Sequence, residues 1–199
     1  MNTAKPFIIG LTGAMGMGKS ATARLFAEEG VPVFDADQAV HDIYANPVAL
    51  GREIESLFPG CIVEGSISRA RIAAQMTPQK LERLEALIHP LVLAMRAQFV
   101  EQYAAAPILV FDVPLLLETG VPVDAVVVAS APSHVQKERV LARPGMTEEK
   151  FAALSARQLS DAQKRAQAQY VVMTGQGLDH AREQVKMILA DIRAKFGNA

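Results

Sequence analysis

The segment Gly13-Ala14-Met15-Gly16-Met17-Gly18-Lys19-Ser20 carries the clearest chemical signal in this chain of 199 residues. It matches the pattern Gly-x-x-x-x-Gly-Lys-Ser in full, between a strand-like and a helix-like segment. The glycines let the backbone curl so that successive amide hydrogens point at phosphate oxygens, and the following helix adds its positive N-terminal end. A tight structural turn is the alternative, which the complete motif in this context disfavours. The segment predicts a site for the phosphates of a nucleoside triphosphate, with ATP expected.

Two side chains at the end of this segment have expected roles of their own. Lys19 would place its positive charge on the β- and γ-phosphates, and the Ser20 hydroxyl would be a ligand of Mg²⁺. Ala21, the next residue, is counted with the ATP-binding set. Asp112 ends the apolar run 108–111, a pattern typical of an acid that supports Mg²⁺ directly or through water. A strand-end cap or turn residue is the alternative for Asp112.

Asp37 is the candidate for an acid on the acceptor side. It comes just after a short apolar segment, 31–34, and ligands of open α/β sheets lie beyond the C-terminal ends of the strands. A carboxylate there accepts a hydroxyl proton as the oxygen attacks the γ-phosphate. The alternative role is a helix cap, since Asp is favoured at that position. Asp35 is the rival candidate, and we expect one of the two to do the capping.

Basic residues gather in the polar stretch 133–169, which we interpret as a flap over the site. Arg139 and Arg143 are four residues apart, and hence on one face of a predicted helix. A guanidinium pair can clamp a phosphate and neutralise charge during transfer, whereas the alternative is a solvated helix face. The stretch also contains Arg157, and it is too polar to form core. His89 has two open roles: contact with a substrate phosphate, or a cap at Pro90.

The motifs favour a small-molecule kinase over a GTPase-like switch. A GTPase needs Asp-x-x-Gly after its third strand and Asn-Lys-x-Asp for guanine, and neither pattern occurs in the sequence. Two alternatives remain open from the residues alone. They are a kinase of another small metabolite, such as a nucleoside, shikimate or gluconate, and, with less support, a nucleotide-dependent switch.

The elements that must position these residues alternate between strand and helix, which predicts an α/β fold with a parallel sheet covered on both faces. Short apolar runs predict about five strands, and amphipathic spacing predicts a final helix with Val185, Ile188, Leu189, Ile192 and Phe196 on one side. Pro90 interrupts a long apolar pattern in the middle of the chain, so we expect two helices that meet at His89-Pro90. The strands are expected at 7–12, 31–34, 108–111, 125–129 and 170–173.

Composition excludes several functional classes. The net charge is −1 with 21% charged residues, which gives no electrostatic footprint for nucleic acid or an acidic membrane. Cys61 is the only cysteine, so no intrachain disulfide is possible, and we expect a half-buried structural thiol. No apolar run approaches the length of a membrane span, and the N-terminus does not read as a signal peptide. A cytoplasmic protein is expected, with a monomer favoured over a homo-oligomer.

Taken together, the motifs resemble the dephospho-coenzyme A kinase family over nearly the whole chain. The phosphate-binding segment alone is shared by many families, whereas the full set in this order is far more specific. The matching segments are Gly10-Leu11-Thr12-Gly13, Val33-Phe34-Asp35-Ala36-Asp37, Ile88-His89-Pro90, Val113-Pro114-Leu115-Leu116-Leu117-Glu118, Gln136 through Arg139 to Arg143, and Gln158.

The resemblance implies transfer of the γ-phosphate of ATP, with Mg²⁺, to the 3′-hydroxyl of the ribose in dephospho-CoA. It implies a three-layer P-loop NTPase fold, similar to nucleoside-monophosphate kinases. The single domain would comprise a core (1–37, 107–130 and 170–199), a helical acceptor region (38–106) and a lid (131–169). It also implies catalytic roles for Asp37, Lys19 and Arg143, and acceptor contacts at Thr12, Asp37, His89, Pro114, Leu115, Leu116 and Glu118.

The sequence departs from the family pattern at two places. The family loop often reads Gly-Gly-Ile-Gly-Ser-Gly, so Ala14 and Met17 are substitutions at tolerant positions that leave phosphate binding intact. Near the fifth strand, Gln169 and Thr174 stand where the family usually has Asp and Asn, which leaves the adenine contacts open. The family does not hold the Asp112 position strictly to Asp, so the metal role of Asp112 stays a hypothesis.

Overall fold

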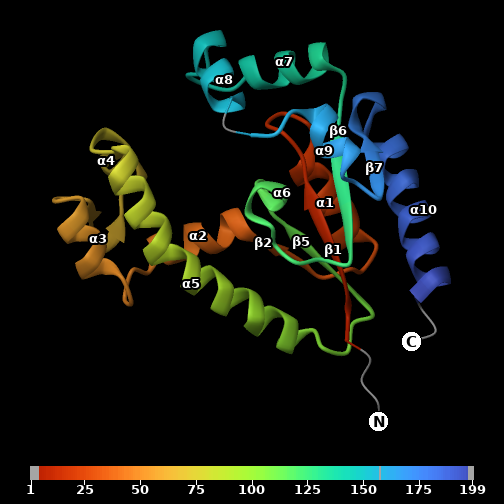
Figure 1. Cartoon of the computed structure of the whole chain (residues 1–199), viewed down its shortest axis with the longest axis horizontal. Helices are drawn as coiled ribbons and strands as arrows, with labels where there is room; N and C mark the ends of the chain where they lie inside the picture. The colour runs from red at the N-terminus through yellow and green to blue at the C-terminus, as the bar shows by residue number, and fades with distance from the viewer. Residues whose placement is uncertain (1–4, 157, 197–199) are drawn as a thin grey trace. The chain divides into compact units, whose positions relative to one another are not determined.

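The computed structural model describes residues 5–156 and 158–196, and these contain one five-stranded parallel sheet in the order β2-β5-β1-β6-β7 (Figure 1). The expected α/β class with a parallel sheet is therefore confirmed. The two outer strands are the shortest, with three residues in β2 and four in β7. The strands are β1 (Phe7–Thr12), β2 (Val33–Asp35), β5 (Ile108–Asp112), β6 (Ala125–Ser130) and β7 (Tyr170–Met173).

The chain divides into two compact units. The first unit comprises the residues up to Phe34 together with those from Tyr103 onward, and it holds the sheet. Its helices are α1 (Lys19–Glu28), α6 (Leu116–Thr119), α7 (Ser133–Leu141), α8 (Glu148–Ser155), α9 (Asp161–Ala166), the 3-10 turn η1 (Thr174–Gln176) and α10 (Leu178–Phe196). The second unit, Asp35–Gln102, is mostly helical.

Alternating side chains on the central strands build the two hydrophobic layers of the first unit. Ile9 and Leu11 of β1 pack on one face with Phe26 of α1 and Leu189 of α10. On β6, Val126 and Val128 belong instead to a second cluster with Leu116 of α6. Because side chains of a strand alternate between faces, this division places helices on both sides of the sheet and gives the expected three layers.

The second unit has its own core and a small hairpin that the sequence analysis missed. Its elements are α2 (Ala36–Ala45), α3 (Gly51–Leu57), β3 (Ile62–Val63), β4 (Ser66–Ile67), α4 (Arg69–Ala74) and α5 (Pro78–Gln102). β3 and β4 pair antiparallel around Glu64-Gly65, both with positive φ (49° and 81°). Hairpin turns with positive φ at both central positions favour Asn-Gly or Asp-Gly, and the Glu-Gly found here is a weaker signal in the sequence.

The helix α5 runs unbroken from Pro78 to Gln102 with Pro90 inside it, so the expected break at His89-Pro90 is wrong. An interior proline costs about 3 kcal/mol because it removes one backbone hydrogen bond and crowds the preceding turn. Leu84 and Ile88 of the same helix are buried in the core of the second unit, at about 1.5–3 kcal/mol each. After Pro90, Leu91, Val92 and Met95 pack against the same core, so packing on both sides of the proline outweighs the local penalty.

Cys61 is fully buried in that core, deeper than the half-buried position expected. Its Sγ lies 3.4 Å from Oε2 of Glu55, to which it donates. Burial and the neighbouring Glu55 carboxylate raise the pKa of the thiol to about 11. The thiol is therefore protonated at neutral pH, which suits a structural role.

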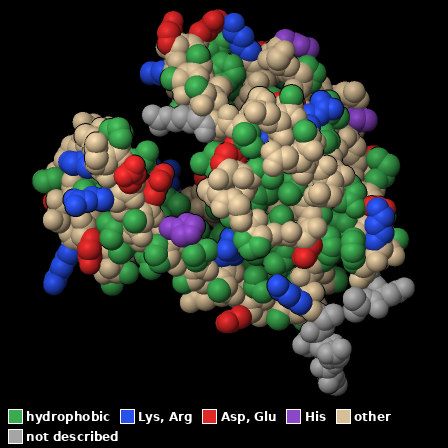
Figure 2. Space-filling model, in the orientation of Figure 1, with side chains coloured by type: hydrophobic (Ala, Val, Ile, Leu, Met, Phe, Trp, Pro, Cys, Tyr) green, Lys and Arg blue, Asp and Glu red, His purple; other side chains and the backbone are tan. Residues whose placement is uncertain are grey.

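The visible surface mixes charges of both signs. Figure 2 shows Lys and Arg side chains interspersed with Asp and Glu on this face, as the net charge of −1 suggests. Among the described residues, every helix is too short or too polar to serve as a membrane span.

Candidate active site

The phosphate-binding segment lies in the first unit, in the connection between the central strand β1 and helix α1. Two of its glycines have left-handed backbone conformations, with φ of 79° at Gly16 and 89° at Gly18. Gly18 is the N-cap of α1, so the loop delivers the chain directly into the helix N-terminus. That placement adds the positive end of the helix to the loop amides, as phosphate binding requires.

Close packing also restricts these two positions to glycine. A Cβ atom on Gly16 would lie 2.6 Å from Cγ2 of Val140 in α7, and one on Gly18 would lie 2.8 Å from Oγ1 of Thr174 in η1. Both distances are below those that real Cβ atoms show. The loop therefore packs against α7 on one side and against η1 on the other.

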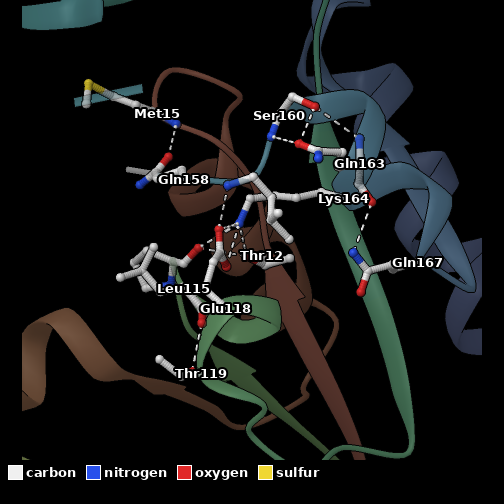
Figure 3. A network of polar contacts seen from close by, with 12 residues as sticks. Thr12, Met15, Leu115, Glu118, Thr119, Gln158, Ser160, Gln163, Lys164 and Gln167 are labelled. Atoms are coloured by element: carbon white, nitrogen blue, oxygen red, sulfur yellow. Dashed lines mark hydrogen bonds and ion pairs between the residues drawn. The ribbon is translucent and has the colours of Figure 1, made fainter. Parts of the chain in front are cut away.

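Two glutamine side chains hydrogen-bond to the backbone of Met15, one at its carbonyl and one at its amide. Nε2 of Gln136 donates to the Met15 carbonyl at 2.8 Å, and the Met15 amide donates to Oε1 of Gln158 at 3.3 Å (Figure 3 shows the second contact). Met17 differs, because its side chain is 2% exposed and its Sδ accepts from the Ala131 amide. Met17 therefore has only its backbone to offer a phosphate.

Lys19 and Asp112 form an ion pair of 2.7 Å between Nζ and Oδ1. Asp112 is the last residue of β5, which pairs with β1 in parallel, and its side chain is 1% exposed. The structure thus brings together the lysine and the acid that the sequence nominated for ATP and metal. Ser20 lies in the first turn of α1 and is exposed, whereas Ala21 is half-buried.

The two lid arginines do not act as a pair on one helix. Arg139 in α7 donates to Oγ1 and to the carbonyl oxygen of Thr174, at 3.0 and 2.8 Å. Helix α7 ends at Leu141, so Arg143 lies past the helix, and it is exposed. The expectation of a shared helical face is wrong, because Arg139 braces the loop's surroundings while Arg143 remains solvent-accessible. Arg157 lies outside the described residues.

Of the two acids Asp35 and Asp37, one is the N-cap of helix α2. The side chain of Asp35 accepts from the Gln38 amide at 3.0 Å and is the N-cap of α2. Asp37 follows in the first turn of α2 and is exposed. Capping of α2 is therefore the role of Asp35, and Asp37 is not the N-cap of this helix. His89 is exposed on α5 and caps no helix, since α5 continues past it.

The segment Pro114–Glu118 follows β5 directly and is held by buried contacts. Leu116 is 1% exposed in the core beside Val126 and Val128, and Thr12 is fully buried with its hydroxyl donating to the Pro114 carbonyl at 2.9 Å. Thr12 and Leu116 are therefore not available to touch an acceptor directly, contrary to expectation, and instead fix the segment. Leu115 is 38% exposed, and the side chain of Glu118 is 19% exposed.

A pocket of about 500 Å³ lies between segment 136–163 and Ala14 of the phosphate-binding loop. Near its floor, Oδ2 of Asp161 accepts from Oγ of Ser130 at 2.8 Å, while Oδ1 of Asp161 is buried with no hydrogen-bond partner. The pocket lining mixes polar and apolar side chains, and Ala14 is its contribution from the loop. Its lining includes Ala14 of the loop, Gln136 and Lys137 of α7, Phe151 of α8, Gln158 and Asp161.

Sequence reasoning missed two residues that organise this site. Thr174 is buried, and its hydroxyl donates to the Met17 carbonyl at 2.7 Å, so it ties the loop to η1. Lys164 is fully buried within the stretch that looked too polar for core. The sequence did mark Thr174 as unusual, because it stands where the family usually has Asn. Nothing in the sequence marked Lys164, since a single lysine among many polar residues is expected to be exposed to solvent.

Comparison with known proteins gives one consistent family. The family model described as dephospho-CoA kinase matches residues 7–180. A protein named dephospho-CoA kinase from Mesorhizobium japonicum is 48% identical over 197 residues, covering 96% of this chain and 99% of the relative. One of the same name from Rhodopseudomonas palustris is 51% identical over 189 residues, covering 92% and 94%.

Solved structures agree on the fold. A protein of known crystal structure from Thermus thermophilus is 31% identical, with a TM-score of 0.82 and coverage of 95% of this chain and 99% of that chain. A dephospho-CoA kinase from Campylobacter jejuni gives a TM-score of 0.65 at 18% identity, with coverage of 95% and 98%. A shikimate kinase from Acinetobacter baumannii gives 0.53 at 20% identity, with coverage of 96% and 94%. The last two, at these identities, support the fold alone.

Proposed function

Because the chain belongs to the dephospho-CoA kinase family, we propose that its phosphate-binding loop, Asp37 and the lid together transfer the γ-phosphate of ATP to the 3′-hydroxyl of the ribose in dephospho-CoA. The chain is an ATP-dependent kinase that acts on a ribose hydroxyl in the final step of coenzyme A biosynthesis. The observation that carries the assignment to this site is the 2.7 Å ion pair of Lys19 with Asp112 beside an intact loop.

In the proposed reaction, the loop amides and Lys19 hold the β- and γ-phosphates. The ribose 3′-oxygen attacks the γ-phosphorus, the bond from that phosphorus to the bridging oxygen of ADP breaks, and Asp37 takes the hydroxyl proton. Arg143 is exposed just past α7, and from the lid its guanidinium neutralises charge on the transferring group. The lid excludes water that would otherwise hydrolyse ATP.

We propose Mg²⁺ as the cation that accompanies ATP. The Ser20 hydroxyl in the first turn of α1 and the Asp112 carboxylate at the end of β5 are oxygen donors, the type that Mg²⁺ prefers. The donor set therefore fits the cation, with Ser20 as a direct ligand and Asp112 as a direct or water-mediated one. When bound, the cation supplies positive charge to the phosphate oxygens.

The remaining acceptor contacts are proposed at His89, Pro114, Leu115 and Glu118. His89 and Leu115 are exposed, which suits contact with a ligand. We further propose that the chain works as a cytoplasmic monomer without nucleic-acid or membrane partners, consistent with a net charge of −1. Light scattering after size exclusion checks the monomer: a mass of two or more chains would overturn it.

A panel of acceptors tests the proposed function. We expect ATP-dependent ADP release with dephospho-CoA at a kcat/KM at least about 100-fold above that with adenosine, shikimate or gluconate, because binding energy from the whole acceptor promotes transfer. A coupled assay for ADP measures this. Preference for another metabolite would favour the alternative kinase, and slow hydrolysis independent of any acceptor would favour a switch.

Substitution of Arg143 by alanine tests the lid contact. We expect kcat/KM for ATP to fall by about 10- to 100-fold, since a charge-assisted hydrogen bond to phosphate is lost. Steady-state kinetics at saturating dephospho-CoA measure it. Arg165→Ala is the matched control, because Arg165 is an exposed lid arginine on α9 and should leave both constants unchanged. Equal kinetics for Arg143→Ala and wild type would show that Arg143 has no such role.

A further inference from the structure

Lys164 is a buried cation with a dense set of oxygen partners. Its side chain is fully buried, and Nζ lies 2.8 and 3.1 Å from Oε1 and Oε2 of Glu118, 3.2 Å from the Pro114 carbonyl and 3.5 Å from the Thr12 hydroxyl (Figure 3). The Thr12 hydroxyl itself donates to the Pro114 carbonyl. The ammonium thus joins three segments that are far apart in the sequence.

These segments are the ones that the proposed reaction uses. Thr12 ends β1 and immediately precedes the phosphate-binding loop, Pro114 and Glu118 bound the acceptor segment, and Lys164 belongs to α9 at the end of the lid. Glu118 also accepts from the Leu159 amide at 2.9 Å. Leu159 is next to Gln158, whose side chain meets Met15 in the loop. The contacts therefore close a ring from the loop, through the lid, back to the strand before the loop.

The two charges compensate each other in this ring. Burial on its own raises the pKa of Glu118, but the hydrogen bonds from Lys164 and from the Leu159 amide outweigh it and leave the pKa below its usual value. Glu118 is therefore ionised at neutral pH, and Lys164 faces a carboxylate, a carbonyl and a hydroxyl. Each of the three partner groups points an oxygen at the same ammonium (Figure 3).

Stability alone does not explain a lysine at this position. A buried ion pair is often no more stabilising than apolar side chains of the same volume, because both charges must leave water. What such a pair supplies is a defined geometry, since one ammonium satisfies several oxygens only in one arrangement of the chain. The geometry it defines here is that of the acceptor segment relative to the end of β1 and to the lid's return segment.

We propose that Lys164 is a positioning residue that sets the acceptor segment Pro114–Glu118 against Thr12 and the end of the lid. This inference rests on the proposed function, in which that segment binds the acceptor. Lys164 touches no reacting atom. Its loss frees the Pro114 carbonyl and the Glu118 carboxylate from their common partner, and acceptor binding weakens while the phosphate-binding loop keeps its own contacts to α7 and η1.

The primary test is Lys164→Met in steady-state kinetics with dephospho-CoA and ATP. We expect KM for dephospho-CoA to rise about tenfold or more, the effect of losing a charge-assisted contact, with KM for ATP within about twofold of wild type. Arg165→Met, the exposed neighbour on α9, should leave both KM values unchanged. Val185→Ala, on the buried face of α10, should lower Tm without moving either KM. Lys164→Met with a lowered Tm and two unchanged KM values would mean a structural role only and overturn the proposal.

Milder variants keep the proposal testable if Lys164→Met does not fold. Glu118→Gln removes the negative charge that faces Lys164, and Thr12→Val removes the hydroxyl, each at nearly constant volume; both should raise KM for dephospho-CoA selectively. Hydrogen exchange of 114–118 and 158–164 should be faster in Glu118→Gln than in Val185→Ala at equal loss of Tm. The proposal is overturned if Glu118→Gln and Thr12→Val both leave KM for dephospho-CoA unchanged and if Glu118→Gln exchanges no faster than Val185→Ala. A wild-type protein inactive with dephospho-CoA is a distinct result that contradicts the proposed function, and the exchange comparison then still decides the role of Lys164.

Discussion

Replacement of Asp37 by asparagine lowers kcat by about 10²–10⁴, the contribution expected of a general base, while KM for ATP stays within about threefold of wild type. Asparagine has nearly the same shape but cannot accept the hydroxyl proton of the acceptor. The structure removes the main competing role, because Asp35 is the residue that caps α2. Loss of activity at Asp37 therefore does not follow from loss of a helix cap.

The matched control for this substitution is Asp35→Asn, two residues away. Asparagine is as good an N-cap as aspartate, so the stability of α2 should be kept. We expect Asp35→Asn to retain kcat within about threefold of wild type and an unchanged Tm. Steady-state ADP release measures both variants. If Asp37→Asn turned over within threefold of wild type, Asp37 would not be the base.

Replacement of Lys19 by methionine lowers kcat by about 10²–10³ and also weakens ATP binding, since the lysine charge on the β- and γ-phosphates is lost. The same change should lower Tm, because Asp112 is 1% exposed and loses its 2.7 Å contact with the ammonium. Kinetics and thermal unfolding together measure the two effects. In Lys19→Met alone, the loss of kcat from catalysis cannot be separated from the loss caused by lower stability.

The double variant Lys19→Met with Asp112→Asn separates the two losses. Neutralising both partners removes the buried charge imbalance, so we expect most of the lost Tm to return while kcat stays low. Recovery of activity along with Tm would show that Lys19 acts by stabilising the fold. Lys19→Arg keeps the charge but changes the reach, and it should retain the ion pair with reduced turnover.

The phosphate-binding loop and the central strands were predictable because their signals are local. A glycine pattern between an apolar run and a helix predicts a curled backbone, and the structure has left-handed φ at Gly16 and Gly18. Apolar runs at 7–12 and 170–173 became β1 and β7 with the same bounds. The third and fourth strands extended by one residue each, to Asp112 and Ser130, because ladder pairing with neighbours extends regular structure past the apolar residues.

Three of the misses depend on tertiary contacts. Pro90 lies inside α5 because packing of the flanking apolar residues outweighs its local penalty. Arg139 turned toward Thr174, 35 positions away in the sequence, so helical spacing alone suggested the wrong partner. Lys164 pairs with Glu118, 46 positions away, and no periodicity marks a lysine that is buried by a distant carboxylate. Such residues become visible only when the sheet has brought the segments together.

The two shortest strands of the sheet, β2 and β7, are its edges, and this has a consequence for behaviour at high concentration. An open edge offers unpaired backbone groups on which a neighbouring molecule can add a strand, and a long flat edge is a template for aggregation. Edges of three and four residues present few such groups. The longer, fully buried strands, β5 and β6, are kept inside the sheet. The strand order therefore hides the most aggregation-prone segments of the chain from other molecules.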